Sequence, residues 1–137
     1  MNIKYKAMVL SCIDPRFQSK VHNFLKRRKL KDKYSSFTIA GAAVGVTHSS
    51  FKKWHKTFIE NLSTSIRLHK INKLIVINHK DCGATKLVNG PRQFDEINEN
   101  KIHEESFKKL EKILNKKFPK LYYEFYLMTL KGSVVRF

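Results

Sequence analysis

The stretch Leu74-Ile75-Val76-Ile77 is an apolar run without a polar interruption, and three of its four residues are β-branched. A short run without alternation is typical of a strand that is buried on both faces of a parallel sheet. A second run of this kind extends from residue 6 to residue 12. The two runs end at polar pairs, Asn78-His79 and Asp14-Pro15 respectively. We therefore predict two buried strands of one mostly parallel sheet.

Helical and strand-like patterns follow the run at residues 6–12. Asp14-Pro15 is a typical helix start, with an N-cap and then a proline at the first helical position. Apolar residues then repeat at helical spacing over residues 17–25, which predicts a helix after the first strand. Phe37–Ala40 is a further strand candidate. It leads into the small residues 41–45, which permit a tight turn or a close backbone approach.

Two further amphipathic helices are predicted. The first is long, and Ser49 or Ser50 can cap it. Its apolar stripe, which we expect to face the core, consists of Phe51, Trp54, Phe58, Leu62 and Ile66. Residues 89–100 are polar and predict an exposed loop, and the second helix covers residues 107–114 until Pro119 ends it.

The C-terminal residues return to a strand pattern. Residues 121–129 and 133–137 are strand-like runs around a Leu-Lys-Gly turn, which suits a terminal β-hairpin. Strands and helices therefore alternate, and this favours an α/β fold with a central, mostly parallel β-sheet flanked by helices and a C-terminal β-hairpin. The length of 137 residues predicts one domain over residues 1–137.

The formal net charge of +17 raises the question of an anionic partner. Lysines and arginines occur in nearly every segment, with one dense run over residues 26–33, and no RNA-recognition or helix-turn-helix signature accompanies them. A solvated surface is therefore the favoured interpretation, while nucleic acid stays open as a partner.

The sequence carries no pattern for a membrane or a secretory route. Its apolar runs are far shorter than the ~20 residues that span a bilayer, so we expect no membrane partner. The two cysteines lie in charged contexts, without the pattern of a disulfide framework. These features predict a protein of the reducing cytoplasm.

Three potential zinc ligands lie where predicted strands end. Cys12 follows the first strand, and His79 and Cys82 follow the strand at residues 74–77. Ligands of open α/β sheets gather at the carboxyl ends of strands. A catalytic zinc site has three protein ligands, often thiolates and imidazoles, and keeps a fourth position for water or substrate. The sequence therefore indicates a zinc site made of Cys12, His79 and Cys82.

Simpler interpretations exist for each of these residues. Either cysteine alone is more readily explained as a small buried hydrophobe, and the combination of the two motifs reverses that preference. Asp14 before proline is often only a helix cap, and Arg16 is often only a surface charge. Beside a metal, Arg16 can keep Asp14 ionised, so that Asp14 orients or deprotonates water. We expect Asp81 to be a turn or cap residue, and the other histidines, His103 among them, to be surface or packing residues.

The motif Cys-x-Asp-x-Arg at residues 12–16, followed by His-x-x-Cys-Gly at residues 79–83, resembles the β-class carbonic anhydrases. The resemblance covers almost the whole chain, since residues 123–132 are similar to the late strand and glycine turn of the family. It implies zinc bound by Cys12, His79 and Cys82, with Asp14 and Arg16 as a catalytic dyad. The implied activity is hydration of carbon dioxide to bicarbonate by water whose pKa the metal lowers to about 7.

The chain departs from the family pattern at several positions. Thr38–Ala42 replaces the usual Arg-Asn-Ala-Gly segment, Asn78 replaces a glycine, and Pro15 replaces a serine. A related small substrate such as carbonyl sulfide or carbon disulfide is therefore an alternative, as is a non-catalytic basic module that binds nucleic acid. The resemblance implies a homodimer or a larger homo-oligomer, and it leaves open whether Asp14 or water is the fourth zinc ligand.

Overall fold

The structure is a computed structural model that describes residues 5–137. Its centre is a five-stranded sheet in the order β2-β1-β3-β4-β5, in which β5 alone runs antiparallel to its neighbour. The strands are β1 (Ala7–Ser11), β2 (Tyr34–Thr38), β3 (Lys73–His79), β4 (Tyr122–Met128) and β5 (Val134–Arg136). The predicted fold class, with a mostly parallel sheet and a C-terminal hairpin, is confirmed.

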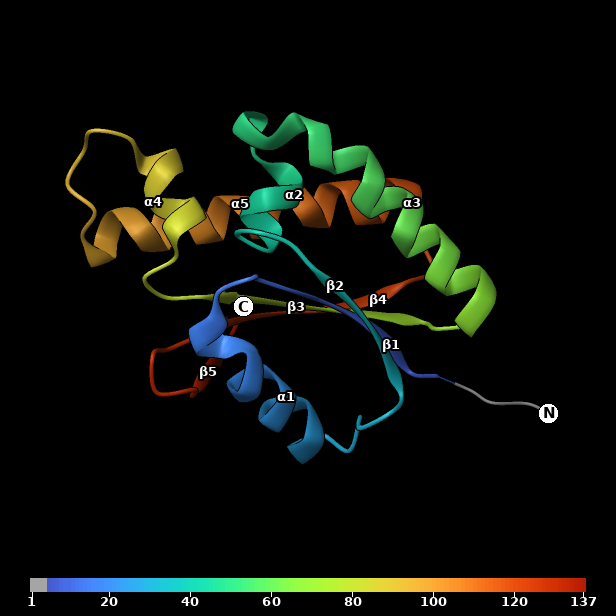
Figure 1. The fold of residues 1–137 in the computed structure, drawn as a ribbon. Coiled ribbons are helices and arrows are strands. Elements are labelled where there is room, and N and C mark those ends of the chain that lie inside the picture. Colours follow the sequence, from blue (N-terminus) through green and yellow to red (C-terminus); the bar gives the residue numbers. More distant parts are fainter. Residues whose placement is uncertain (1–4) are drawn as a thin grey trace.

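Helices cover both faces of the sheet. Figure 1 shows α1 on one face and the other four α-helices on the opposite face. The helical elements are η1 (Pro15–Phe17), α1 (Gln18–Arg27), α2 (Ala43–Thr47), η2 (Ser49–Phe51), α3 (Lys52–His69), α4 (Gly83–Asn89) and α5 (Glu96–Lys117). Within residues 5–137 no helix combines the length and apolar character needed to cross a bilayer.

The central strands are apolar on both sides because each face has its own core. On β1, Met8 and Leu10 pack with α2, α3 and α5, while Ala7 and Val9 pack with α1. Alternate side chains of a strand point to opposite faces, so two covered faces require a continuous apolar run. This arrangement is the physical reason for the unbroken runs in the sequence.

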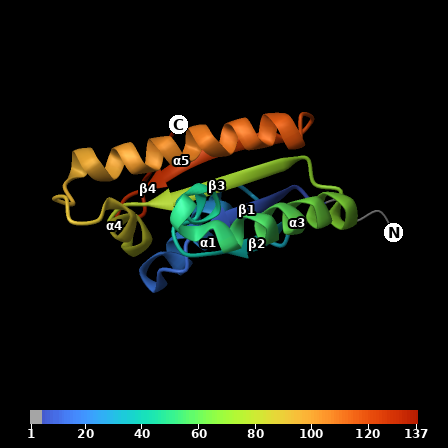
Figure 2. The ribbon, with the colours of Figure 1, turned by 90° about the horizontal axis from the view of Figure 1, so that it is seen from above.

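The two long helices lie along the same face of the sheet (Figure 2). Phe107 of α5 stacks on Phe125 of β4 with ring centroids 5.1 Å apart. Phe58 of α3 meets Phe37 of β2 edge to face at 5.5 Å. The short helix α2 contacts both long helices. It thereby fixes the segment that follows β2 above the carboxyl ends of β1 and β3.

Several local predictions were wrong. The loop predicted over residues 89–100 is present only at residues 90–95, because α4 extends to Asn89 and α5 begins at Glu96. The Asp95 side chain caps α5 by accepting a hydrogen bond from the Asn98 N–H at 2.8 Å. Acidic residues in the first turn suit the helix dipole, so the polarity of this segment reflects an exposed helix start. β2 begins at Tyr34 and ends at Thr38 instead of covering residues 37–40.

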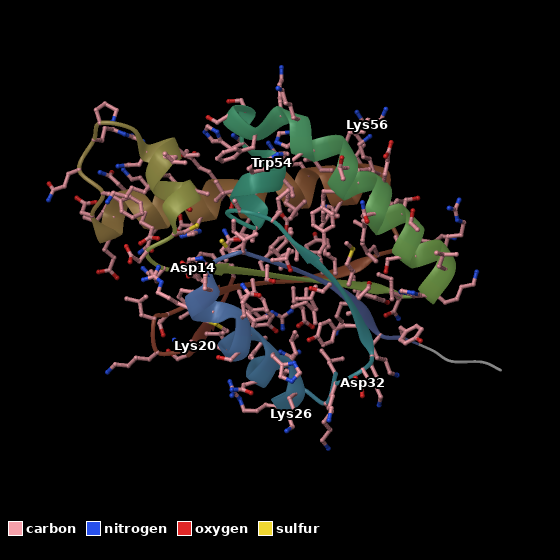
Figure 3. The ribbon with its side chains drawn as sticks, viewed as in Figure 1. Asp14, Lys20, Lys26, Asp32, Trp54 and Lys56 are labelled. Atoms are coloured by element: carbon pink, nitrogen blue, oxygen red, sulfur yellow. The ribbon has the colours of Figure 1, made fainter. Side chains whose placement is uncertain are left out.

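Two details of the region around α3 also differ from expectation. Neither Ser49 nor Ser50 caps α3, which follows Phe51 without a side-chain capping bond. His48 instead caps the preceding η2, since its Nδ1 accepts a hydrogen bond from the Ser50 N–H at 3.0 Å. Trp54 is half-buried and stacks on Phe51 with centroids 4.7 Å apart, outside the main core cluster. Figure 3 labels Trp54 in the helix layer, near the start of α3.

Candidate metal centre

The three predicted ligands converge at the carboxyl ends of the two central strands. β1 and β3 are parallel neighbours, with Ser11 opposite Ile77. Cys12 directly follows β1, His79 ends β3, and Cys82 is the N-cap of α4. All three side chains are buried, and their ligand atoms lie within 4.8 Å of one another. The strand register therefore brings together residues that are far apart in the sequence.

The His79 ring is held in the orientation that a metal ligand needs. Its Nδ1 lies 2.7 Å from the Lys80 carbonyl oxygen, which can only accept, so Nδ1 carries the proton. The buried Nε2 has no hydrogen-bond partner within residues 5–137, and the ring stacks on Phe17 at 4.0 Å. Nε2 thus offers a free lone pair to the space between the two cysteines. Metal-binding histidines are commonly oriented by such a bond from the other nitrogen.

The two thiols share a polar environment that favours one thiolate. A hydrogen bond from Cys12 lowers the pKa of Cys82 below that of an ordinary thiol and outweighs the opposing effect of burial. The same shared bond and burial raise the pKa of Cys12. The Gly41 N–H also donates to the Cys12 sulfur at 3.3 Å. Two sulfurs and one imidazole are the donor set that zinc prefers, so the residues present fit this metal.

The Asp14 carboxylate lies beside the donor set. Its Oδ2 is 3.8 Å from the His79 Nε2. Arg16 donates to Asp14 from its backbone N–H at 2.9 Å and from Nη2 at 2.8 Å, with Nε slightly farther away. These bonds from Arg16 lower the pKa of Asp14 to about 2. Asp14 is therefore a carboxylate at neutral pH, adjacent to the position where a metal would lie.

Arg16 also binds the turn between β3 and α4. Its Nη1 donates to the Asp81 carboxylate at 3.0 Å, and its Nη2 donates to the Asp81 carbonyl oxygen at 2.9 Å. Asp81 has a φ of 56°, a left-handed conformation that reverses the chain between His79 and Cys82. The predicted turn role of Asp81 is thus confirmed. Its pairing with Arg16 joins the segment after β1 to the segment after β3.

A buried polar network, which sequence reasoning missed, supports the site from α5. The Ala43 N–H donates to the Asn78 Oδ1 at 3.0 Å, and this fixes the orientation of the Asn78 amide. The Asn78 Nδ2 then donates to the His103 Nδ1 at 2.8 Å, so the His103 Nε2 carries a proton and donates to Glu99 at 3.2 Å. The other partner of Glu99 is the Cys82 N–H at 3.3 Å.

The members of this network differ from what the sequence suggested. His103 is a packing residue, as predicted, but its contacts are polar and it is fully buried. Asn78 occupies the position where the resembled family has glycine, and its side chain links β3 to α2 and α5. The sequence contained two signals for this network. One is a polar residue at the end of an apolar strand, and the other is a glutamate and a histidine four residues apart on one helix.

The surroundings of the donor set differ between its two sides. Cys12, Cys82 and Ala84 form a small apolar cluster, with Ala40 and Phe51 packed against it. On the other side, beyond the turn at Asp81, a cavity of about 660 Å³ is lined by residues that include Asp81, Glu99 and Lys80. The centre therefore lies between an apolar wall and a polar wall.

Comparison with known sequences gives one family. The model of the family described as "Putative carbonic anhydrase" matches residues 2–119. An uncharacterized protein of Rickettsia bellii is 29% identical over 128 residues, which are 93% of this chain and 78% of that protein. An uncharacterized protein of Rickettsia conorii is 27% identical over the same length, which is 93% of this chain and 69% of its own.

Comparison with solved structures gives the same fold. A carbonic anhydrase from Glaciozyma antarctica has a TM-score of 0.63 at 15% identity, with 98% of this chain and 84% of that one covered. The β-carbonic anhydrase CafA of Aspergillus fumigatus has a TM-score of 0.64 at 11% identity, with 97% and 75% covered. A β-carbonic anhydrase from Sordaria macrospora, described as tetrameric, has a TM-score of 0.58 at 9% identity, with 98% and 81% covered.

Proposed function

Because this chain belongs to the family described as "Putative carbonic anhydrase", we propose that it binds one zinc ion and catalyses the reversible hydration of carbon dioxide to bicarbonate. Cys12, His79 and Cys82 would be the ligands. The observation that carries the proposal is their convergence within 4.8 Å around the unpartnered His79 Nε2, with the Asp14 carboxylate beside them. The β-carbonic anhydrase fold supports it.

Each residue of the site has a distinct role in this proposal. The chemistry that zinc supplies when bound is a lowered pKa of water, about 7, which makes water nucleophilic at neutral pH. Asp14 would orient that water by accepting a hydrogen bond from it. With a pKa of about 2, Asp14 is too weak a base to remove a proton at neutral pH, so we favour orientation over deprotonation.

Arg16 would keep Asp14 off the metal. Its three side-chain bonds and one backbone bond engage both carboxylate oxygens of Asp14, and its bond to the Asp81 carboxylate fixes the guanidinium. Water would then have the fourth zinc position. The apolar wall of Ala40, Phe51 and Ala84 suits an uncharged substrate such as carbon dioxide.

Stopped-flow hydration of carbon dioxide by protein of measured zinc content tests the proposal. We expect one zinc per chain and catalysis above the buffer rate. Cys82→Ser and His79→Asn should lose the zinc, whereas His22→Asn, a change at an exposed histidine of α1, should keep both zinc and activity. One zinc per chain without hydration at any pH would contradict the reaction but not the metal site. Faster turnover of carbonyl sulfide than of carbon dioxide would instead support the hydrolase alternative.

We also propose that the protein forms a homodimer or a larger homo-oligomer. The related Sordaria macrospora enzyme is described as tetrameric. β2 is at the edge of the sheet and presents unpaired backbone groups that a second copy can use. Light scattering after gel filtration should give at least twice the 16.1 kDa of one chain. A mass of one chain at micromolar concentration would contradict this proposal.

A further inference from the structure

A second cavity lies at the opposite end of the sheet from the metal centre. Its volume is about 350 Å³, and it is bordered by the amino-terminal ends of β1 and β3 and by the chain that follows α1. Five basic residues line it, namely Lys6, Arg28, Lys29, Lys33 and Lys73. The other lining residues are uncharged. The dense basic run of the sequence therefore contributes three of its side chains to a concave surface.

This cavity is here called the basic cavity, and its floor consists of core residues. Ala7 and Ile75 lie there and are buried in the core under α1. Glu124, which lies opposite Ile75 on the neighbouring strand β4, accepts hydrogen bonds from Lys73 at 2.8 Å and from Arg28 at 3.0 Å. Burial raises the pKa of Glu124, but the bonds from Lys73, Tyr126 and Arg28 outweigh it and lower the pKa to about 2.

Arg28 is held from several sides. Its Nη1 donates to the Tyr126 hydroxyl at 2.7 Å, and the guanidinium lies over the rings of Phe24 and Tyr126 at 5.6 and 5.7 Å. Together with its bond to Glu124, these contacts give the guanidinium one position at the wall of the cavity. Arg28 and Lys73 are thus already placed before any ligand arrives.

The remaining three lysines have no carboxylate partner. Within residues 5–137, Lys6, Lys29 and Lys33 take part in no ion pair. The backbone that carries them is nevertheless ordered, because the Lys6 N–H donates to the Lys33 carbonyl at 2.6 Å and the Leu30 N–H donates to the Leu25 carbonyl at 3.0 Å. Five basic residues therefore line one cavity whose lining includes no carboxylate, while Glu124 beside it pairs with Arg28 and Lys73.

We propose that the basic cavity binds a small molecule that carries two or more adjacent phosphate groups. Like charges that converge on a concave surface repel one another and focus a positive potential, which an anion relieves. Ammonium groups and a fixed guanidinium are typical phosphate ligands. A singly charged anion such as bicarbonate would leave most of the excess charge unbalanced, so the ligand is distinct from the product proposed for the metal centre.

Size and position favour a small ligand over nucleic acid. A cavity of about 350 Å³ is at the lower end of the range for small-molecule sites. The cavity lies beyond the carboxyl end of α1, near the labelled Lys26 and Asp32 (Figure 3). Asp14 of the metal centre precedes the other end of that helix. β1, which separates the two sites, spans roughly 17 Å. Binding in the basic cavity can therefore be measured independently of the metal.

Isothermal titration of the zinc-loaded protein with inorganic pyrophosphate tests the proposal. At about 0.15 M salt, where surface charges are screened, we expect a dissociation constant in the micromolar range. The double variant Lys6→Ala/Lys33→Ala should weaken binding at least about tenfold, because it removes two of the five cations. The matched control Lys112→Ala/Lys116→Ala removes the same charge from exposed positions of α5 and should bind pyrophosphate within about twofold of the parent protein.

Further measurements distinguish a specific phosphate site from a diffuse charge effect. Thermal melts check that both double variants are folded, and zinc is measured before and after titration because pyrophosphate binds metals. Equal weakening in both variants would show a diffuse charge effect and overturn the proposal. The absence of binding below millimolar pyrophosphate would also overturn it. Tighter binding of citrate would overturn the assignment to phosphate. A DNA oligonucleotide that binds more tightly and displaces pyrophosphate would overturn the assignment to a small molecule.

Discussion

At the scale of single residues, Arg16 is the side chain on which the proposed chemistry depends most. It is exposed, and the sequence predicted its pairing with Asp14 but not its bonds to Asp81. Its bonds reach Asp14 on one side and Asp81 on the other, so one guanidinium holds the ends of β1 and β3 in register around the donor set. Deletion of this group should therefore change the behaviour of Asp14 more than it changes the fold.

We expect Arg16→Gln to shift the activity profile toward higher pH. The Asp14 Oδ2 lies 3.8 Å from the His79 Nε2. Without Arg16, Asp14 would be free to take the fourth metal position in competition with water. Hydroxide competes better as pH rises, so hydration near pH 7 should fall at least about tenfold and recover in part above about pH 8.5. Stopped-flow rates against pH measure this, with Arg16→Lys as the control that keeps the charge. An unchanged profile would contradict the role given to Arg16.

Arg16→Gln should also change how the free energy of unfolding depends on pH in acid. The pKa of Asp14 is depressed from 3.8 to about 2, so the ion pair stabilises the folded protein above about pH 4 and loses that contribution as pH falls through 2. The difference in unfolding free energy between the parent protein and Arg16→Gln should therefore be constant above pH 4 and shrink toward pH 2. Urea unfolding at several pH values measures it. A difference that grows in acid would have the wrong sign.

At the scale of secondary-structure elements, Asn78 connects three of them. Its amide joins β3 to the start of α2 and to His103 and Ser106 of α5. Asn78→Ala would leave the buried Ala43 N–H and the His103 Nδ1 without the partners that Asn78 provides. Groups of this kind cost about 1–3 kcal/mol each when unsatisfied, so we expect a loss of at least about 2 kcal/mol.

Urea unfolding compares this variant with Asn61→Ala. Asn61 lies on the exposed side of α3 and its amide donates only to the Thr57 carbonyl at 2.8 Å, so the control should change stability by less than about 0.5 kcal/mol. Equal losses at the two positions would show that the network does not carry the stability assigned to it.

The entry into α2 depends on a close backbone approach at Gly45. A Cβ at this position would overlap the Ala40 carbonyl oxygen, which cannot move without displacing the turn above Cys12. We expect Gly45→Ala to destabilise the fold by about 2 kcal/mol or more. Gly83→Ala is the control, since nothing lies within 4 Å of a Cβ built there, and it should be neutral or stabilising by up to about 1 kcal/mol. Thermal melts that rank the two variants in the opposite order would contradict this prediction.

At the scale of the whole molecule, the metal would join the two central strands to α4. Its proposed ligands come from the end of β1, the end of β3 and the cap of α4. A ligand that binds only the folded state raises stability by about 4 kcal/mol at a thousandfold excess over its dissociation constant. Zinc should therefore raise the melting temperature of metal-free protein by several degrees, on the order of 10 °C.

Differential scanning fluorimetry after chelation and reconstitution measures this effect. Magnesium serves as the control ion, since it prefers oxygen ligands and should leave the melting temperature unchanged. Cys12→Ser should make the melt insensitive to zinc. A zinc response that persists in this variant would place the metal elsewhere in the molecule.

The single-domain organisation and the cytoplasmic location stay predictions, as does nucleic acid as a partner. The two free cysteines agree with a reducing compartment without establishing one. The +17 charge now has one concrete candidate role, the basic cavity, which is independent of the proposed hydration reaction.

Local periodicity in the sequence determined the architecture. Buried parallel strands require unbroken apolar runs, and helices require apolar residues at helical spacing, so residues 7–11, 73–79 and the stripe of α3 could be recognised directly. The placement of Cys12, His79 and Cys82 at strand ends followed from the same patterns, since parallel strands end at one edge of a sheet.

Only the tertiary structure decided the contacts between distant residues. Arg16 with Asp81, Asn78 with His103, and Lys6 with the chain near Lys33 meet because the strand register and the helix crossovers bring them together. A repeat of 2 or 3.6 residues carries no information about which side chain lies opposite another across the fold. The network around Glu99 and His103 and the basic cavity lined by Ile75 therefore became visible only when the sheet order and the position of each helix were known.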